Sequence, residues 1–500
     1  MSQNPAGDQP PLHVETYPHL YRDSVALMAL AAGLEKLDGV AKAGAVMATP
    51  ANLGILARSD MLPPDLDPAP DDLLVAVRAE GPEALAAALE QARHELLDAA
   101  PASGGPGGPA EQPPRTVAEG IAACPEDAPA GLVAVSVPGT YAAVVAQQAL
   151  ASGQHVFCFS DNVTLEDEVA LKARAAAAGL LFMGPDCGTA QLDGVRLGFT
   201  NAVRPGPAGI VAAAGTGAQE LACLIDRAGG GVSHIIGVGG RDLSDAVGGR
   251  MTLQAVDRLA ADPATGVIAV VSKPPAPAVA QRLMERLAAV REQSGKPVVA
   301  CLLGVDDAGG SPSVVVRDTL EGGAEAVVAA LGLTLPDDEL AAPRPAVPGG
   351  VLGLYTGGTL AAEAKLLLGR AGVPHEVLDL GDDQYTQGRP HPMIDPELRA
   401  EWVARAGERP DLGVILVDVV LGAGSAADPA GPLADAIAAA TRAARAAGRD
   451  LRTVATVVGA DADPQDPAGQ IARLKAASAA VTRRNAAAVR AAIALVGGPR

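Results

Sequence analysis

Two glycine–threonine turns, each at the start of a helical pattern, could bind an anion. Residues 212–229 read AAAGTGAQELACLIDRAG and residues 356–372 read TGGTLAAEAKLLLGRAG, so a Gly-Thr pair, a later Glu and a final Arg-Ala-Gly recur together. Glycine lets the backbone approach a ligand, and the first turn of a helix offers free N–H groups. An Ala- and Gly-rich chain produces single turns of this kind by chance. Their joint recurrence favours two helix starts directed at one anion.

Three further glycine clusters follow apolar runs: VPGT at 137–140, MGPDCGT at 183–189 and GVGGRD at 237–242. Ligands of doubly wound sheets bind beyond the carboxyl ends of the strands, where such turns lie. Parallel sheets also need tight turns, so each cluster alone is a weak signal. Neither GxxxxGK[ST] nor GxGxxG with a downstream acidic residue occurs at these turns, which argues against a nucleotide site.

The composition excludes several classes of partner. The chain has 500 residues and a formal net charge of −20, with 49% hydrophobic and 2% aromatic residues. Nucleic acids and anionic membranes bind clustered Lys and Arg, so we expect neither. The five cysteines show no CxxC or Cys/His spacing, so we expect no disulfides and no metal site. The N-terminus lacks an apolar signal segment, and no apolar run reaches the roughly 18 residues of a membrane span. A cytoplasmic protein that binds a small anionic substrate is the simplest expectation.

The order of periodic segments predicts one small α+β domain followed by α/β layers. Helical and strand-like segments fill residues 16–100, and the Pro/Gly-rich segment PASGGPGGPAEQPP follows. Beyond it, short apolar strands alternate with helices, as in parallel sheets built from βαβ units. The predicted boundaries are 1–100 for the α+β domain, 101–114 for a linker, 115–204 and 205–334 for two α/β domains, 335–349 for a second linker and 350–500 for a third α/β domain.

Several of these segments resemble the subunits of succinyl-CoA synthetase. VSVPG, GPDCG and GTGAQELACLIDRAGGGVSHIIGVGGRDL are similar to its α subunit, and GGTLAAEAKLLLGRAG, GVILVDVVLG and VATVVGADADPQ are similar to the carboxy-terminal domain of its β subunit. With YRDSVALM and ATPAN ahead of them, and RPHPMIDP at 389–396, the order resembles the FdrA family over residues 16–500. The resemblance implies a CoA-binding-type Rossmann domain at 115–204 and two flavodoxin-like, synthetase-like domains at 205–334 and 350–500.

In the synthetase, one helix from each subunit directs its amino end at a phosphate group. The positions that match these helix starts are Ala214, Gly215, Thr216 and Gly217, together with Gly357, Gly358 and Thr359. Each helix start carries roughly half a unit of positive charge. Two of them could therefore hold phosphate in an acidic chain without a cluster of lysines.

Two features of the synthetase are missing here. Its α subunit carries a phosphorylated histidine shortly after GKPVV, but no histidine occurs between His234 and His375. His234 itself lies in the apolar run VSHIIGV, where a core role is favoured. Nothing in residues 1–114 resembles an ATP-grasp domain, and the glycine turn that opens the CoA-binding domain of the synthetase is absent before Val133. We therefore expect that the chain alone neither activates an acid with ATP nor forms a phosphohistidine. Whether it binds CoA is left open.

The FdrA resemblance implies a subunit of oxamate carbamoyltransferase, which interconverts oxalurate and phosphate with oxamate and carbamoyl phosphate in ureide breakdown. Phosphate would be a co-substrate, no further cofactor is expected, and other subunits and self-association are implied. One alternative is an acyl-CoA synthetase subunit that binds CoA. A second is a non-catalytic scaffold subunit that binds an anionic metabolite.

Under this hypothesis the residues near the turns take different roles. His391 in RPHPMIDP could donate a proton to the leaving nitrogen, oriented by Asp395 or Asp242, although a merely rigid proline loop is an equal alternative. Candidates for binding the substrate carboxylate are Lys273, Arg241 and Arg389. Candidates for an oxyanion hole are the N–H groups of Gly239 and Gly240. The remaining pocket residues are Pro138, Gly139, Gly184, Pro185, Asp186 and Cys187, of which Cys187 is more typical of a small buried residue than of a nucleophile.

Overall fold

A computed structural model describes residues 10–22, 24–98, 114–305, 313–338, 345–386 and 390–498. The chain divides into two units, residues 1–114 with 383–390 and residues 115–382 with 391–500. Within the described residues, no helix combines the length and the apolar character needed to cross a membrane.

The first unit is a three-stranded antiparallel sheet of order β1-β3-β2 with helices on both faces. Its central strand alternates between two cores, because Val75 and Val77 pack with α1 and α3 whereas Leu74 and Ala76 pack with Leu56 of α2. The elements are β1 (Leu12–Tyr17), α1 (Ser24–Leu34), β2 (Val40–Met47), α2 (Pro50–Arg58), β3 (Leu73–Ala79), α3 (Pro82–Arg93) and η1 (His94–Asp98), and α12 (Asp383–Thr386) belongs to the same unit. The predicted small α+β domain is confirmed.

The second unit opens with a three-stranded parallel sheet of order β4-β5-β6. Its elements are α4 (Val117–Ala122), β4 (Leu132–Val135), α5 (Gly139–Ala151), β5 (His155–Cys158), α6 (Leu165–Ala177) and β6 (Phe182–Met183). Each strand is followed by a turn and, for the first two strands, by a helix. The carboxyl ends of all three strands therefore lie on one edge of this sheet, as in other βαβ layers.

A seven-stranded sheet of order β13-β12-β11-β9-β10-β7-β8 follows. Its five parallel strands take the order 2-1-3-4-5 of flavodoxin-like sheets. The hairpin β7–β8 joins through antiparallel pairing of β7 with β10, so this sheet takes two strands from before residue 205. The elements are β7 (Thr189–Leu192), β8 (Val195–Gly198), β9 (Pro205–Ala213), α7 (Gly215–Arg227), β10 (Val232–Gly237), α8 (Arg250–Ala261), β11 (Val267–Ser272), α9 (Pro277–Ser294), β12 (Val298–Leu302), β13 (Val315–Arg317) and α10 (Leu320–Ala330).

The last sheet is wholly parallel and has the order β15-β14-β16-β17-β18, which is again 2-1-3-4-5. Its elements are β14 (Gly350–Tyr355), α11 (Gly358–Arg370), β15 (His375–Asp379), α13 (Glu397–Ala406), β16 (Leu412–Val420), α14 (Ala430–Ala446), β17 (Arg452–Val458), α15 (Pro467–Ala476), β18 (Ala480–Thr482) and α16 (Asn485–Leu495). The repeated sequence thus marks the first strand–helix corner of two sheets with the same topology.

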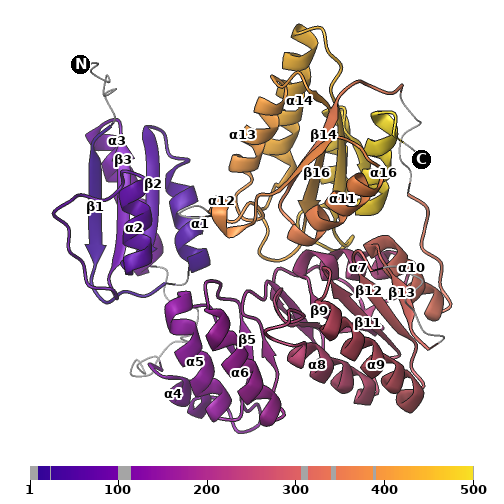
Figure 1. Cartoon of the computed structure of the whole chain (residues 1–500). Coiled ribbons are helices and arrows are strands. Elements are labelled where there is room, and N and C mark those ends of the chain that lie inside the picture. Colours follow the sequence, from indigo (N-terminus) through magenta and orange to yellow (C-terminus); the bar gives the residue numbers. More distant parts are fainter. Residues whose placement is uncertain are drawn as a thin grey trace. The chain divides into compact units, whose positions relative to one another are not determined.

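Helices α7 and α10 of one sheet pack against α11 and α16 of the other (Figure 1). Their apolar faces form one continuous core with the strands beneath them, including Leu221 and Leu360. This packing brings the first helix of each sheet against its counterpart. The predicted α/β class, with flavodoxin-like synthetase-type sheets, is confirmed.

Candidate functional site

The starts of α7 and α11 are in contact. A Cβ atom placed on Gly357 would lie 2.9 Å from Thr216 Oγ1 and 3.0 Å from Thr216 Cβ. One placed on Gly217 would lie 2.8 Å from Thr359 Cγ2. Only glycine lets the two backbones approach this closely. The two repeated turns therefore lie face to face.

Backbone N–H groups are free at both helix starts. Ala214 and Gly357 occupy the N-cap positions, and neither supplies a side-chain cap. Within the part of the chain that the structure describes, no protein acceptor contacts the N–H groups of residues 215–217 or of residues 358–360. Each set lies at the positive end of a helix dipole, so the two sets together suit a tetrahedral oxyanion.

A buried carboxylate fixes the turn before α11. Asp418 accepts hydrogen bonds from the N–H groups of Thr356 and Gly357, both at 2.8 Å. Arg399, which is 1% exposed, donates to the same carboxylate at 2.8 Å. A buried ion pair persists only where further hydrogen bonds satisfy both groups. Asp418 thus binds the N–H groups of Thr356 and Gly357, whereas the N–H groups of residues 358–360 stay available for a ligand.

Opposite charges flank the start of α11. The position of a Cβ on Gly358 would lie 2.4 Å from Asp379 Oδ2 and 3.2 Å from Lys273 Nζ. Burial raises the pKa of Asp379 to about 6, although Lys273 lowers it. Lys273, predicted to bind substrate, thus lies beside the predicted phosphate ligands. Asp379 carries no sequence signal beyond its place at the end of β15, so the sequence alone does not single it out.

His391 lies beside Gly381, in the turn that follows β15. Its Nε2 is 2.4 Å from the position of a Cβ on Gly381, and its ring centroid is 6.0 Å from that of Phe199. Nδ1 accepts the N–H group of Met393 at 3.2 Å, which assigns the proton of the neutral ring to Nε2. Burial lowers the pKa of His391 to about 4. At neutral pH the ring can donate a hydrogen bond, but it is not an imidazolium acid.

The predicted pocket residues gather where β4, β5 and β6 end, beside the turn after β10. Gly239 has φ +83° and a Cβ position 2.6 Å from the Pro185 carbonyl oxygen, and a Cβ on Gly139 would lie 2.3 Å from the Asp161 carbonyl oxygen. Gly240 is exposed, and no atom lies within 4 Å of its Cβ position. The group comprises Pro138, Gly139, Gly184, Pro185, Asp186, Gly239 and Gly240. It occupies the strand ends at which doubly wound sheets bind ligands.

Thr189 lies between this group and the helix starts. Its Oγ1 is 3.3 Å from the position of a Cβ on Gly215, and its carbonyl oxygen is 2.3 Å from that of a Cβ on Gly237. The same Cβ position on Gly237 is 2.5 Å from Cys187 Sγ, and burial raises the pKa of the Cys187 thiol to about 12. Cys187 is therefore a buried thiol and not a thiolate nucleophile.

Arg241 and Asp242 form ion pairs with residues of α6. Lys172, which is 0% exposed, lies 2.7 Å from Glu168 Oε1 and 2.9 Å from Asp242 Oδ1, and Arg241 lies 2.7 Å from Glu168 Oε2. Asp242 also accepts the N–H group of Thr252 at the start of α8. These contacts join α6 to the turn before α8. None of the contacts that the described residues make links Arg241 or Asp242 to the starts of α7 and α11.

Three other predicted residues lie apart from the helix starts or cannot be placed. His234 accepts the N–H group of Asp193 at 3.0 Å and so joins β10 to the hairpin β7–β8. Asp395 accepts the N–H group of Glu397, the first residue of α13, at 3.0 Å, and among the described contacts its carboxylate has none with the ring of His391. Arg389 lies outside the described residues.

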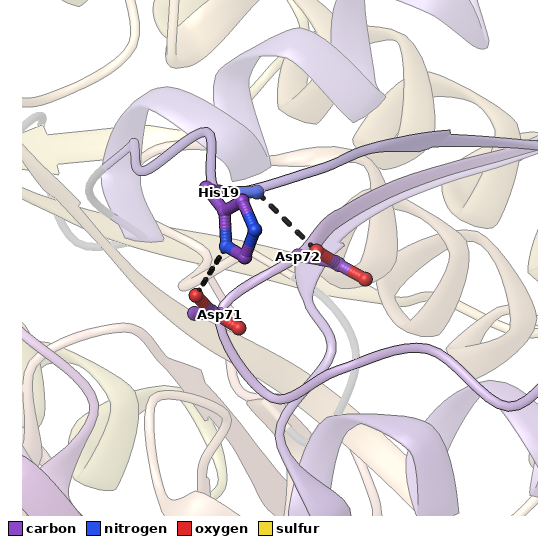
Figure 2. A group of neighbouring side chains, drawn as sticks. All are labelled: His19, Asp71 and Asp72. Carbon is purple, nitrogen blue, oxygen red and sulfur yellow. Dashed lines mark hydrogen bonds and ion pairs between the residues drawn. The ribbon is translucent and has the colours of Figure 1, made fainter.

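The group of metal-type ligands found among the described residues lies in the first unit (Figure 2). His19 Nδ1 is 2.6 Å from Asp71 Oδ2, and this hydrogen bond raises the pKa of His19 and lowers that of Asp71. Asp72 accepts the N–H groups of His19 at 3.3 Å and of Ala69 at 2.9 Å. The side chains of His19 and Asp71 are exposed.

Comparison with known proteins identifies relatives of each part. Residues 10–113 match the family "AllF, heavy metal-associated domain", residues 204–299 match "CoA binding domain", and residues 354–495 match "CoA-ligase". The Escherichia coli protein described as "Uncharacterized protein YahF" is 40% identical over 487 residues, which cover 89% of this chain and 91% of that protein. The chain belongs to the YahF family.

Other proteins similar to this YahF-family chain are named as CoA ligases or acyl-CoA synthetases. Succinate–CoA ligase [ADP-forming] subunit alpha-2 of Trichomonas vaginalis is 31% identical over 182 residues, 36% of this chain and 57% of that protein. The acetyl-coenzyme A synthetase 1 of Candidatus Korarchaeum cryptofilum, solved with phosphate and ADP, is 16% identical with a TM-score of 0.34, covering 75% of this chain and 84% of that one. The matches to the CoA-binding and CoA-ligase families make the protein succinyl-CoA synthetase-like, whereas the finer resemblance to FdrA stays a prediction. The CoA-binding match covers 204–299, whereas the sequence resemblance assigned that type to 115–204.

The first unit of this YahF-family chain does not suit a soft heavy metal. Such metals favour thiolate ligands, and residues 10–113 contain no cysteine. In the group of His19, Asp71 and Asp72, the histidine is already paired with Asp71, and Asp72 binds two backbone N–H groups. We therefore derive no chemistry from a metal in this unit.

Proposed function

We propose that the chain is an acyl-transfer subunit of the succinyl-CoA synthetase type, which exchanges an acyl group between CoA and phosphate. A phosphate oxygen attacks the thioester carbonyl, a C–O bond forms and the C–S bond breaks. The proton that the phosphate gives up goes to the sulfur of CoA. The products are an acyl phosphate and free CoA.

The observation that carries this proposal is the contact between the starts of α7 and α11. Residues 215–217 and 358–360 carry free N–H groups at two helix starts that are in contact, and Lys273 lies beside Gly358. Phosphate bound there is held by dipoles that need no reorganisation, which is the arrangement that stabilises developing negative charge most effectively.

The strand ends beside this place are the proposed site of the acyl-CoA. Thr189 lies against both Gly215, where α7 begins, and Gly237, where β10 ends, and the proposal is that the thioester carbonyl binds beside these residues, next to a phosphate oxygen. Holding both reactants side by side converts a bimolecular step into an effectively unimolecular one. His391, which is neutral, could donate a hydrogen bond from Nε2–H to a bound reactant. A nucleotide-dependent step, which the chain does not provide alone, would need a partner subunit.

A second candidate function is carbamoyl transfer, with oxalurate replacing acyl-CoA. It follows from the resemblance to the FdrA family, and it suits a chain that has no histidine between His234 and His375, where the synthetase α subunit carries its phosphorylated one. Both candidates use the same phosphate site and differ in the group that phosphate attacks. A non-catalytic anion-binding subunit is the third possibility that an assay must separate.

The test uses the full-length chain, alone and with the proteins encoded beside it. Acetyl-CoA or succinyl-CoA is incubated with phosphate, and free thiol and acyl phosphate are measured; oxalurate with phosphate is assayed in parallel for carbamoyl phosphate. The inactive variant is Gly357→Ala, whose Cβ would meet Thr216 at 2.9 Å, and its matched control is Gly369→Ala, whose nearest neighbour is 4.0 Å away at the other end of α11.

We expect phosphate-dependent release of CoA that is lost in Gly357→Ala and kept in Gly369→Ala. Carbamoyl phosphate formed from oxalurate, without thiol release from either thioester, would replace the acyl-CoA proposal with the second candidate. Phosphate binding without turnover of any substrate would assign the chain a scaffold role. Equal activity in both alanine variants would remove the helix starts from the mechanism.

A further inference from the structure

Asp379 is a carboxylate placed where an oxyanion would bind. Its Oδ2 is 2.4 Å from the Cβ position of Gly358, the first residue of α11, and its Oδ1 is held by the N–H group of Gly381 at 3.1 Å. Within the described residues, no hydrogen bond joins Asp379 to the free N–H groups of residues 358–360. The carboxylate borders the donors without satisfying them. An anion that fills this place must therefore contact an acidic side chain.

The charges around Asp379 come from four elements. Lys273, after β11, lowers its pKa, whereas Asp418 of β16 and Asp382, after β15, raise it. His391 faces Gly381 and is neutral, because burial holds the pKa of His391 near 4. The largest effect is burial, and the net result is a pKa of about 6 for Asp379. The Asp379 carboxylate is thus ionised at neutral pH, but its protonation requires little free energy because its pKa lies only slightly below 7.

An ionised carboxylate accepts hydrogen bonds and cannot donate them. Beside it, a fully ionised oxyanion is repelled, whereas an anion that carries its own proton can donate an O–H group to the carboxylate. Phosphate at neutral pH carries such a proton, and sulfate does not. A site built to bind an O–H group discriminates strongly against an analogue that lacks one, because a buried acceptor is then left unpaired.

We propose that Asp379 makes the site at the helix starts selective for a protonated oxyanion, phosphate, over a fully ionised one such as sulfate. The inference rests on the proposed function, since it names the selectivity of the same site. One proton is shared between Asp379 and the bound phosphate, and the phosphate brings it. Sulfate binds only after Asp379 has taken a proton from solvent.

The test is calorimetric titration of the full-length chain with inorganic phosphate and with sulfate between pH 6 and 8. Above the pKa of Asp379, sulfate affinity should fall about tenfold for each unit of pH, while phosphate affinity changes much less. In Asp379→Asn the amide can donate to either anion, so we expect the ratio of the two affinities to become small and independent of pH. Asp435→Asn, at an exposed position of α14, is the control that should keep the wild-type ratio.

The outcomes separate this inference from the proposed function. If neither anion binds the wild-type chain, the phosphate site itself is wrong. If both bind with a ratio that does not change with pH, or if Asp379→Asn keeps the wild-type ratio, the site stands and Asp379 does not set its selectivity. A circular dichroism melt of each variant shows that it is folded before binding is compared.

Discussion

Glu220 and Glu363 each accept a hydrogen bond from the first residue of a helix that belongs to the other flavodoxin-like sheet. Glu220 of α7 accepts the N–H group of Asn485, where α16 begins, at 2.8 Å. Glu363 of α11 accepts the N–H group of Leu320, where α10 begins, at 2.7 Å. The two carboxylates are the recurring Glu of the sequence repeat, four residues after each threonine. The repeat therefore encodes a reciprocal clamp that holds the two helix starts face to face.

This clamp makes stability depend on pH. Burial raises the pKa of Glu363 to about 7 and that of Glu220 well above its ordinary value, with Glu363 raising it further. Because both folded-state pKa values exceed the unfolded ones, the stability that these two glutamates contribute is greatest at low pH and is lost as the pH rises from about 4.5 through about 7. Glu220→Gln keeps the acceptor for Asn485 and removes the charge, so we expect its melting temperature to exceed that of the wild type by about 2 °C at pH 8 and to match it at pH 5. Melts monitored by circular dichroism check this, with exposed Glu325→Gln as control; equal melting temperatures at both values of pH would contradict it.

Lys273 is an exposed cation beside the start of α11. Among the described residues, it is the positively charged one nearest the Cβ position of Gly358. Lys273→Met removes a full charge at contact distance from the anion, and we expect phosphate to bind roughly tenfold more weakly, an effect of about 1.4 kcal/mol. Lys365→Met, exposed in the middle of α11, should leave the affinity unchanged. Titration calorimetry at low ionic strength measures both, and equal affinities in the two variants would place the anion elsewhere.

The sequence could predict that the two helix starts pair because the chain repeats itself. The Gly-Thr turns and the glutamates recur at fixed spacing, so contact between the starts of α7 and α11 follows from two copies of one topology. Asp379 and Asp418 could not be found in this way. Their importance comes from neighbours far apart in the chain, Gly358 for Asp379 and Arg399 for Asp418. No local pattern records such a contact.

The charged residues expected at the site show the same limit. Arg241 follows a glycine turn at the end of a strand, where a ligand contact is a reasonable expectation, but its guanidinium pairs with Glu168 of α6. Asp242 follows in the same turn and instead joins Lys172 to the start of α8. Buried charges require partners. Which of several acidic residues becomes that partner is decided by packing and cannot be read from spacing.

His391 should stay neutral through the physiological range. Burial lowers its pKa to about 4, and the N–H group of Met393 fixes Nδ1 as an acceptor. In a chain labelled with ¹⁵N-histidine, the resonances that disappear in His391→Gln should report an Nε2-protonated neutral ring from pH 8 down to about 5. Protonation of His391 near pH 6.5 would instead restore the role of an imidazolium acid.

The first unit should bind thiophilic metals weakly despite the description of its family. It has no cysteine, and the oxygens of Asp72 are occupied by backbone N–H groups. Titration of the full chain with Cu⁺ or Cd²⁺ should show no difference between the wild type and His19→Ala. A chelator should leave the thermal melt unchanged. Binding at micromolar concentration that His19→Ala abolishes would show that the group of His19, Asp71 and Asp72 is a metal site after all.

Asp463 should be more important for stability than its exposed neighbour. The acidic segment DADPQDP reads as a solvated helix start, yet Asp463 is 5% exposed and accepts from Asn201 Nδ2 at 2.7 Å and from the N–H group of Ala202 at 2.6 Å. Asp463→Ala leaves those donors unpaired between the two flavodoxin-like sheets, so we expect a loss of about 3 kcal/mol. Asp461 pairs with Arg483 but is 78% exposed, so Asp461→Ala should cost less than about 1 kcal/mol. Urea unfolding followed by circular dichroism compares the two variants. A smaller loss for Asp463→Ala than for Asp461→Ala would mean that the junction near residue 201 is held by its apolar contacts alone.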